Sequence, residues 1–207
     1  MKANKPEITR ELITAAPHIA RCYSVVDLGT HTYEWKGNPV TSRKVRVTWE
    51  LPEDLITYTN KEGVEVTAPQ VIGQEYSLSM GTKSKLRPVV ESMIGTKLSD
   101  EEAYGFEITD LVGMACMLQV VHVEKNGNTY ANIGSIMQVM KSMTCPAQVN
   151  PSVIFEFDNW KQDVYEKLPQ FIREKIDESQ ERMMKKTVEN HDDSEDAFAG
   201  IEDDIIL

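Results

Sequence analysis

Aromatic and cationic side chains alternate through the first quarter of the chain. Arg21 and Tyr23 share one face of a first expected strand, and Lys44 and Arg46 follow the polar face of the next. Cations pair with phosphates, and exposed aromatic rings stack on nucleobases at about 1–3 kcal/mol each. If the two strands are neighbours, these four residues form one basic strip with chemistry suited to a nucleic-acid strand.

The segment between these two strands adds Tyr33, Trp35 and Lys36 beside Gly37. Aromatic residues are unusual in a loop, where they have no core to fill. We therefore expect Trp35 to be the main stacking residue. The alternative is that its ring folds back onto the body of the protein.

Other cations and tyrosines extend this pattern along the sequence. These further candidates are Arg43, Tyr58, Tyr76, Lys83, Lys85, Arg87, Lys125 and Tyr130. Together they predict a binding track that reaches a second basic cluster. Ordinary solvated charges and packed tyrosines explain the same residues equally well, so both interpretations stay open at this point.

The residue pattern does not favour an enzyme. The four histidines, His18, His31, His122 and His191, lie far apart in the sequence. The chain has no Cys-x-x-Cys, no His-Glu-x-x-His and no glycine-rich phosphate loop. We expect no catalytic residues, no metal and no cofactor.

The formal net charge of −11 is concentrated at one end of the chain, because residues 188–207 contain eight acidic side chains and no Lys or Arg. Without these eight charges the rest of the chain carries only −3. Such a segment cannot bury enough apolar area to offset the entropy of ordering, so we expect a disordered tail. We expect its tip to dock on another protein. The tip residues are Asp203, Asp204, Ile205, Ile206 and Leu207.

The sequence has no apolar run long enough to span a membrane, and its first 17 residues do not have the pattern of a secretory signal. Cys22, Cys116 and Cys145 are an odd number at wide spacings, which favours reduced and mostly buried thiols over disulfides. We therefore expect a cytoplasmic protein.

Strand signals dominate the first 150 residues. The expected strands are 18–28, 44–51, 55–59, 64–68, 74–80, 115–124 and 128–139. Trp49 alternates with apolar residues and is assigned to the core, while Asn126-Gly127 predicts a tight hairpin. A helix is expected over 84–94, with Ser84 as N-cap, and a second helix start at Ser99. This order predicts a mainly β protein with an OB-fold, a five-stranded Greek-key barrel with an interposed helix, followed by a C-terminal helix and the disordered acidic tail.

Four stretches of the sequence resemble phage-encoded single-stranded-DNA-binding proteins. They are Ala20–Thr30, Lys44–Pro52, Tyr76–Leu78 with Lys83–Arg87, and Gly127–Ile133. The resemblance covers roughly residues 15–140. It implies an OB-fold protein that coats single-stranded DNA in phage replication or recombination, without sequence preference and without a catalytic site. Tyr130 matches the family pattern, and Lys125 lies in a loop that OB proteins often use to clamp their ligand.

The acidic tail resembles that of bacterial single-stranded-DNA-binding proteins, whose tip recruits replication and repair enzymes. Those tails end in an Asp-rich run followed by Ile-Pro-Phe, whereas Ile206-Leu207 stands in place of Pro-Phe in this chain. A terminal Phe fills a deeper pocket than a Leu. The resemblance therefore leaves open whether the receptor belongs to the phage or to its host.

The composition divides the chain into an expected DNA-binding domain over 1–148, a linker and helix over 149–187, and the tail over 188–207. The middle region either forms a homodimer interface or wraps around its own barrel, since Phe155, Phe157 and Trp160 need something to pack on. The rival to DNA coating is a protein-interaction module or DNA mimic that binds a replication or recombination protein.

Overall fold

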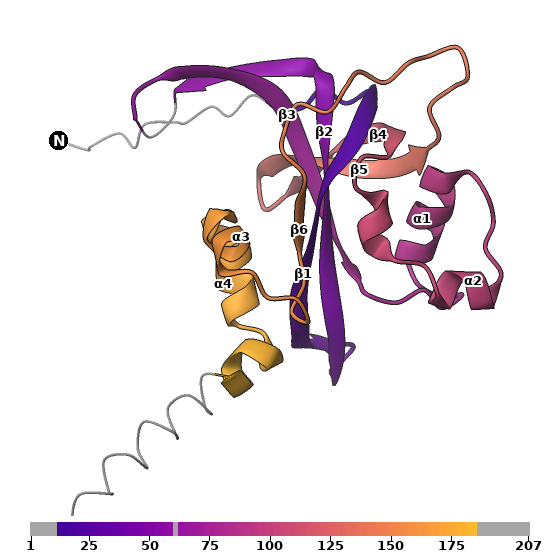
Figure 1. Ribbon diagram of the computed structural model, residues 1–207, viewed down its shortest axis with the longest axis vertical. Helices are drawn as coiled ribbons and strands as arrows, with labels where there is room; N and C mark the ends of the chain where they lie inside the picture. Colours follow the sequence, from indigo (N-terminus) through magenta and orange to yellow (C-terminus); the bar gives the residue numbers. More distant parts are fainter. Residues whose placement is uncertain (1–11, 60–61, 186–207) are drawn as a thin grey trace, which may run out of the picture.

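The computed structural model describes residues 12–59 and 62–185 as a mainly β protein. Five strands run in the order β3-β2-β1-β4-β5 with every neighbouring pair antiparallel. They are β1 (Pro17–Trp35), β2 (Asn38–Thr59), β3 (Glu65–Ser77), β4 (Ala115–Lys125) and β5 (Asn128–Met137). Because β3 and β5 approach each other at the two ends of this order, the sheet is a nearly closed barrel, consistent with an OB-like fold (Figure 1).

The strands are longer and fewer than the sequence predicts. The expected strands 44–51 and 55–59 are both part of β2, because the chain passes Pro52 through a bulge between Leu51 and Leu55 instead of ending the ladder. Likewise 64–68 and 74–80 are mostly covered by the single strand β3. Thr59 pairs with Glu65, so β2 and β3 form a hairpin.

Two tight turns join consecutive strands of the barrel. Asn126 and Gly127 both have positive φ, 53° and 76°, which confirms the predicted β4–β5 hairpin. Lys36 and Gly37 also have positive φ, 50° and 79°, and join β1 directly to β2. The prediction of a loop around Tyr33 and Trp35 is therefore wrong: they belong to a β-hairpin whose turn is only two residues long.

Three short helices lie between β3 and β4. They are α1 (Leu86–Ile94), α2 (Asp100–Tyr104) and the 3-10 helix η1 (Ile108–Leu111). Ser99 caps α2 in a capping box with Glu102, as its sequence predicts. The predicted cap of α1 is wrong by one residue, since Lys85 is the N-cap and Ser84 accepts a hydrogen bond from the amide of Leu86 instead.

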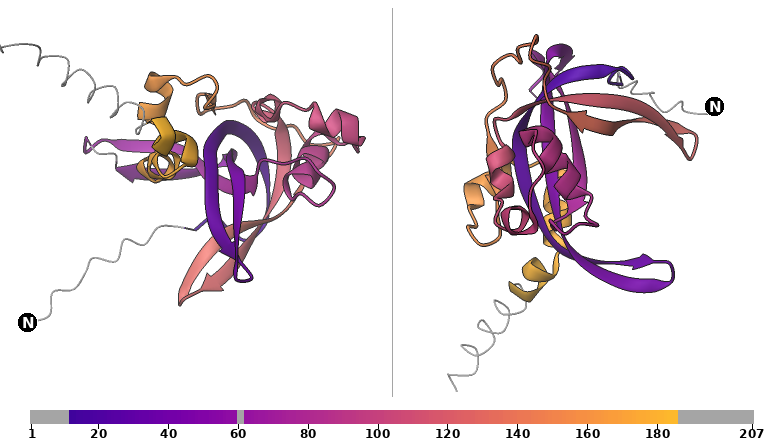
Figure 2. Two further views of the ribbon diagram at one scale, coloured as in Figure 1. Left: turned by 90° about the horizontal axis from the view of Figure 1, so that it is seen from below. Right: turned by 90° about the vertical axis from the view of Figure 1, so that its right-hand side faces the viewer.

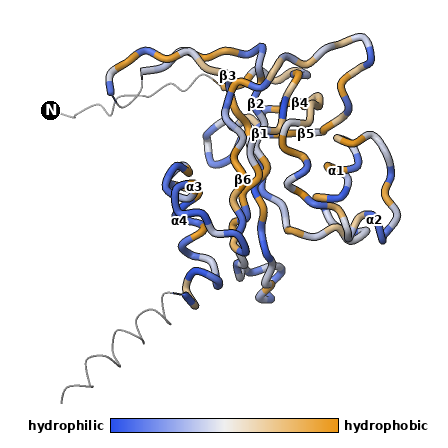
Figure 3. Tube along the Cα trace, in the orientation of Figure 1, coloured by the Kyte–Doolittle hydropathy of each residue, from blue (hydrophilic) through white to orange (hydrophobic). Residues whose placement is uncertain are grey.

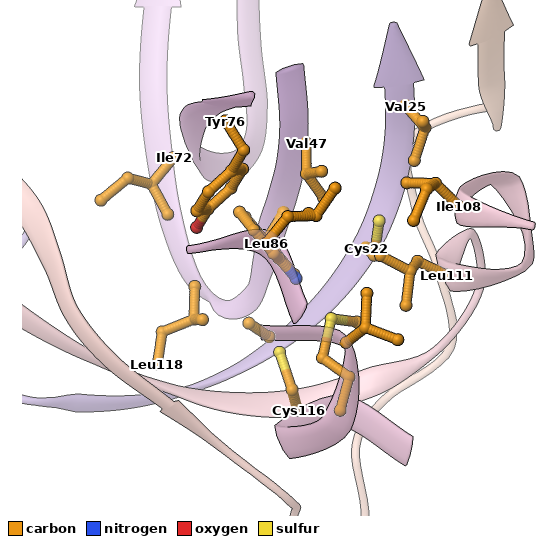
Figure 4. Close-up of a cluster of buried hydrophobic side chains, with 14 of the residues drawn as sticks. Cys22, Val25, Val47, Ile72, Tyr76, Leu86, Ile108, Leu111, Cys116 and Leu118 are labelled. Atoms are coloured by element: carbon orange, nitrogen blue, oxygen red, sulfur yellow. The ribbon is translucent and has the colours of Figure 1, made fainter. Parts of the chain in front are cut away.

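The barrel interior is a single apolar core. Trp49 is fully buried in it, as its alternation predicts, and Cys22 and Cys116 are buried free thiols. Tyr76 and Leu86 of α1 contribute to the same cluster (Figure 4). The helices between β3 and β4 therefore cover one end of the barrel.

The C-terminal region packs on the outside of the same barrel. It contains β6 (Val153–Phe155), which pairs in parallel with β1, followed by α3 (Gln162–Lys167) and α4 (Gln170–Asp177). Figure 3 shows α3 and α4 as largely hydrophilic, so these two helices have few apolar side chains to bury against the barrel. Those few form a second core with Val26 and Leu28 of β1. The segment therefore wraps around its own barrel, as one of the two alternatives predicts, and the homodimer interface stays a prediction.

A buried carboxylate fixes the start of this C-terminal region. Glu50 is fully buried on β2 and accepts hydrogen bonds from the amides of Val149 and Asn150, each at 2.7 Å. The Asn150 side-chain amide donates a third hydrogen bond at 2.7 Å.

The expected helix over 170–188 is interrupted after Asp177 and is helical again from Gln180 to the last described residue, Lys185.

Candidate functional site

The β1–β2 hairpin carries an exposed row of aromatic and cationic side chains. Tyr33 and Trp35 are two residues apart on β1 and therefore share one face of the hairpin. Trp35 is 62% exposed, and Tyr33 is 38% exposed. The Nζ of Lys44 lies 4.4 Å from the centroid of the Tyr33 ring, and that of Lys36 lies 6.0 Å from the Trp35 ring. We call Tyr33, Trp35, Lys36 and Lys44 the arm track.

The two lysines of the arm track keep their charge available. Lys44 donates a hydrogen bond to the hydroxyl of Ser77 at 2.9 Å, and neither Lys36 nor Lys44 forms an ion pair with any described residue. His31 lies on the same face two residues before Tyr33, and its Nε2 is 2.9 Å from the carbonyl of Leu28. Sequence reasoning missed His31, although the alternation His31, Tyr33, Trp35 is visible once a strand is assumed.

A second hairpin points in the same direction as the arm track. Lys125 and Tyr130 lie on the β4–β5 hairpin, and Tyr130 is about half exposed. Figure 2 shows the β1–β2 and β4–β5 hairpins projecting from the same side of the barrel, while α3 and α4 lie toward the other side. The structure therefore gives one side of the barrel two arms that each carry an aromatic residue and a lysine.

Arg21 and Tyr23 do not belong to this surface. The Arg21 guanidinium donates to the carbonyl of Gly113 at 2.5 Å and to that of Pro146 at 2.9 Å, so it ties two loops to β1. Tyr23 is the extra residue in a bulge between Cys22 and Ser24. Burial raises the pKa of Tyr23 above its ordinary value. The predicted strip of Arg21, Tyr23, Lys44 and Arg46 is therefore not a continuous exposed surface.

The two arginines of β2 are occupied by contacts within the fold. Arg43 donates to the carboxylate of Asp27, an interaction that raises the pKa of Arg43. Arg46 pairs with Glu75 at 3.4 Å and lies 5.2 Å from the Phe171 ring of α4. The polar face of β2 is thus covered at Arg46 by Phe171 of the C-terminal region, while Lys44 of the same face remains accessible, a division that the alternation pattern alone did not reveal.

The second predicted cluster is also divided. Arg87 donates to Glu91 at 3.1 Å and to Asp100 at 2.6 Å, and thereby joins α1 to α2. Lys83 and Lys85 remain exposed in the segment that precedes α1. Only these two cations of the cluster are accessible to a ligand.

The remaining two tyrosines lie in different environments. Tyr76 is buried in the barrel core, and burial raises its pKa. Tyr58 is about half exposed and pairs with Val66 on the β2–β3 hairpin, which extends away from the barrel in another direction (Figure 1). Neither contributes to the arm track. The five tip residues Asp203, Asp204, Ile205, Ile206 and Leu207 lie outside the described residues.

The described residues include no helix that is long and apolar enough to cross a membrane. Within 12–59 and 62–185, no three His, Cys, Asp or Glu side chains are grouped to hold a metal ion. No model of a known protein family matches the chain, and no curated protein matches it. Function must therefore be argued from the site itself.

Proposed function

We propose that this chain is an OB-fold protein that binds single-stranded DNA without sequence preference. The observation that carries the proposal is the arm track, in which two exposed aromatic rings and two lysines without an ion pair to any described residue share one hairpin. Stacking on exposed rings requires bases that are not already stacked in a duplex, so this surface favours a single strand. Aromatic stacking also tolerates every base, which fits binding without sequence preference.

The β4–β5 hairpin completes the proposed binding side. In OB-folds, ligands lie against the barrel and its flanking loops, and the two projecting hairpins correspond to such loops. In this proposal the single-stranded DNA contacts Tyr33 and Trp35 at one arm and Tyr130 at the other. Lys36, Lys44 and Lys125 neutralise its phosphates. Among the described residues of the two arms, these are the three cations that form no ion pair, so we expect a modest salt dependence.

The resemblance to phage single-stranded-DNA-binding proteins supports a biological role in coating and protecting DNA during phage replication or recombination. In this proposal the acidic tail recruits replication or recombination proteins through its apolar tip. The tail also competes with DNA for the lysines of the arms, since its eight carboxylates resemble a phosphate backbone.

Fluorescence anisotropy of labelled oligo-dT and of a matched duplex tests the proposal. The full chain is expected to prefer the single strand, with a slope of log K against log salt of about −2, because three released counterions contribute about −0.7 each. A chain that ends at Thr187 is expected to bind more tightly.

The opposite results favour the alternative class. If neither chain binds oligo-dT and removal of the tail abolishes binding to a protein partner, the protein is an interaction module or DNA mimic. Equal affinity for single strand and duplex would contradict the stacking mechanism.

A further inference from the structure

The helical segment that follows α4 holds the root of the β1–β2 hairpin. Both carboxylate oxygens of Glu181 accept hydrogen bonds from Thr30 of β1: the backbone amide donates at 2.8 Å and the hydroxyl at 2.6 Å. The side-chain amide of Gln180 donates to the hydroxyl of Thr32 at 3.1 Å. Consecutive residues of the helix therefore contact alternate residues of the strand.

The helix and the strand also approach each other closely just before this contact. Gly29 has a positive φ of 78°, and a Cβ built on it would lie 2.5 Å from the Cβ of Ser179. Ser179 is fully buried. Only glycine fits both the backbone conformation and the available space, so the position of the helix on β1 is fixed by shape as well as by hydrogen bonds.

This contact matters because the hairpin has little other support along that edge. The pairing of β1 with β4 ends at Arg21, and its pairing with β6 ends at Val26. Beyond Val26, β1 has only β2 as a neighbouring strand among the described residues. A two-stranded hairpin is marginally stable by itself in water, so a contact at its root determines how firmly its tip is held.

The Glu181 carboxylate is suited to this task. Its burial raises its pKa, but the two hydrogen bonds from Thr30, a hydrogen bond from its own backbone and the positive charge of Arg43 together outweigh that effect, and the pKa of Glu181 is lowered from its ordinary value. The carboxylate is therefore ionised at neutral pH and forms hydrogen bonds of the stronger, charge-assisted kind.

We propose that Glu181 is a positioning residue of the nucleic-acid site. Glu181 holds the β1–β2 hairpin so that Tyr33 and Trp35 face the bound DNA on the same side as the β4–β5 hairpin. This inference rests on the proposed function. The charge of Glu181 and its positioning role have opposite effects on DNA affinity, because an acidic residue close to a phosphate-binding surface opposes binding electrostatically. Loss of Glu181 weakens DNA binding only if its positioning role outweighs its charge.

Glu178 provides the matched control. It lies three residues earlier, at the C-cap of α4, is exposed, and has the same charge. Glu178→Ala and Glu181→Ala each remove one negative charge, but only Glu181→Ala removes the hydrogen bonds to Thr30. Glu181→Gln retains one acceptor oxygen and is expected to restore part of the effect.

Two readouts on the full chain test the inference. Without DNA, amide hydrogen exchange in peptides that span residues 27–44 is expected to accelerate in Glu181→Ala and to stay unchanged in Glu178→Ala. With oligo-dT, anisotropy is expected to show affinity about tenfold weaker for Glu181→Ala, the equivalent of one hydrogen bond to a charged group. Glu178→Ala is expected to bind as tightly as the unaltered chain or slightly more tightly.

The outcomes separate this inference from the function on which it rests. If the unaltered chain and Glu181→Ala bind oligo-dT equally, the positioning role is refuted and the proposed function stands. If exchange in residues 27–44 does not change in Glu181→Ala, the hairpin is held by other contacts and the inference is also refuted. If the unaltered chain does not bind, both the proposed function and the positioning role are refuted.

Discussion

Replacing Phe155 by alanine tests whether the C-terminal region is an integral part of the fold. Phe155 is 2% exposed and lies in the second core between β1 and the C-terminal helices. Its ring centroid is 4.9 Å from that of Trp160, 5.9 Å from that of Phe157 and 6.1 Å from that of Tyr165. The substitution therefore removes the centre of an aromatic cluster that the helices need in order to stay on the barrel.

The expected loss is about 3–5 kcal/mol in the free energy of unfolding, the usual range for a buried Phe→Ala change that leaves a cavity. Domains of this size have a total stability of only about 5–15 kcal/mol, so the effect is large. Ile154 is the matched control, because it precedes Phe155 on β6 and is 40% exposed. We expect Ile154→Ala to change stability by no more than about 0.5 kcal/mol, as is usual for surface positions.

Urea unfolding followed by both circular dichroism and tryptophan fluorescence measures these differences. The two probes are expected to report one shared transition in the unaltered chain, since Trp49 lies in the barrel core and Trp160 packs against the second core. A Phe155→Ala loss no larger than that of Ile154→Ala would refute the second core. Two separate transitions in the unaltered chain would show that the C-terminal region folds independently of the barrel.

Three further outcomes follow from the structure. Trp35→Ala is expected to weaken oligo-dT binding about 5- to 150-fold, the equivalent of about 1–3 kcal/mol of stacking. The melting temperature of this variant is expected to stay unchanged because the ring is exposed. An unchanged affinity would remove Trp35 from the site. Hydrogen bonds from Lys97, Arg87 and the backbone of Leu98 lower the pKa of Glu91 to about 2. The ionised Glu91 therefore contributes fully to the free energy of unfolding at pH values above the pKa of a Glu in the unfolded chain, and this contribution is lost as the pH falls toward 2. Urea unfolding at pH 6 and pH 3 is expected to show a smaller loss of stability in Glu91→Gln than in the unaltered chain, and equal losses would contradict this role. Burial raises the pKa of Cys22 to about 12, so a thiol reagent at neutral pH is expected to label the partly exposed Cys145 first, and mass spectrometry that found Cys22 labelled first would contradict the assigned burial.

The sequence predicted the parts of the fold that depend on local pattern. The alternation around Trp49 identifies the buried face of β2, and Asn126-Gly127 identifies the β4–β5 hairpin, because both signals involve residues close together in the chain. The turn at Lys36-Gly37 was missed since its first residue is not one of the usual turn formers. As a result, Tyr33 and Trp35 were predicted as stacking residues of a loop, whereas the structure places them on a strand.

The site was predicted less completely because strand alternation shows which residues share a face but not what covers that face. Arg46 lies on the polar face of β2, yet Glu75 and Phe171 occupy it. Arg21 is bound to the carbonyl of Pro146, 125 residues further along the chain. These partners are set by how the C-terminal region and the loops fold onto the barrel, and no local pattern contains that information.

Ultraviolet cross-linking of oligo-dT to the full chain, followed by peptide mapping, locates the surface that contacts DNA. Cross-links are expected at Tyr33 or Trp35 of the β1–β2 hairpin and at Tyr130 of the β4–β5 hairpin, and they are expected to disappear at high salt. Tyr58 is the internal control, since it is as exposed as Tyr130 but lies on a different hairpin. Cross-links confined to Tyr58, or to the part of β2 around Arg46 that Phe171 of α4 covers, would contradict the proposed binding surface.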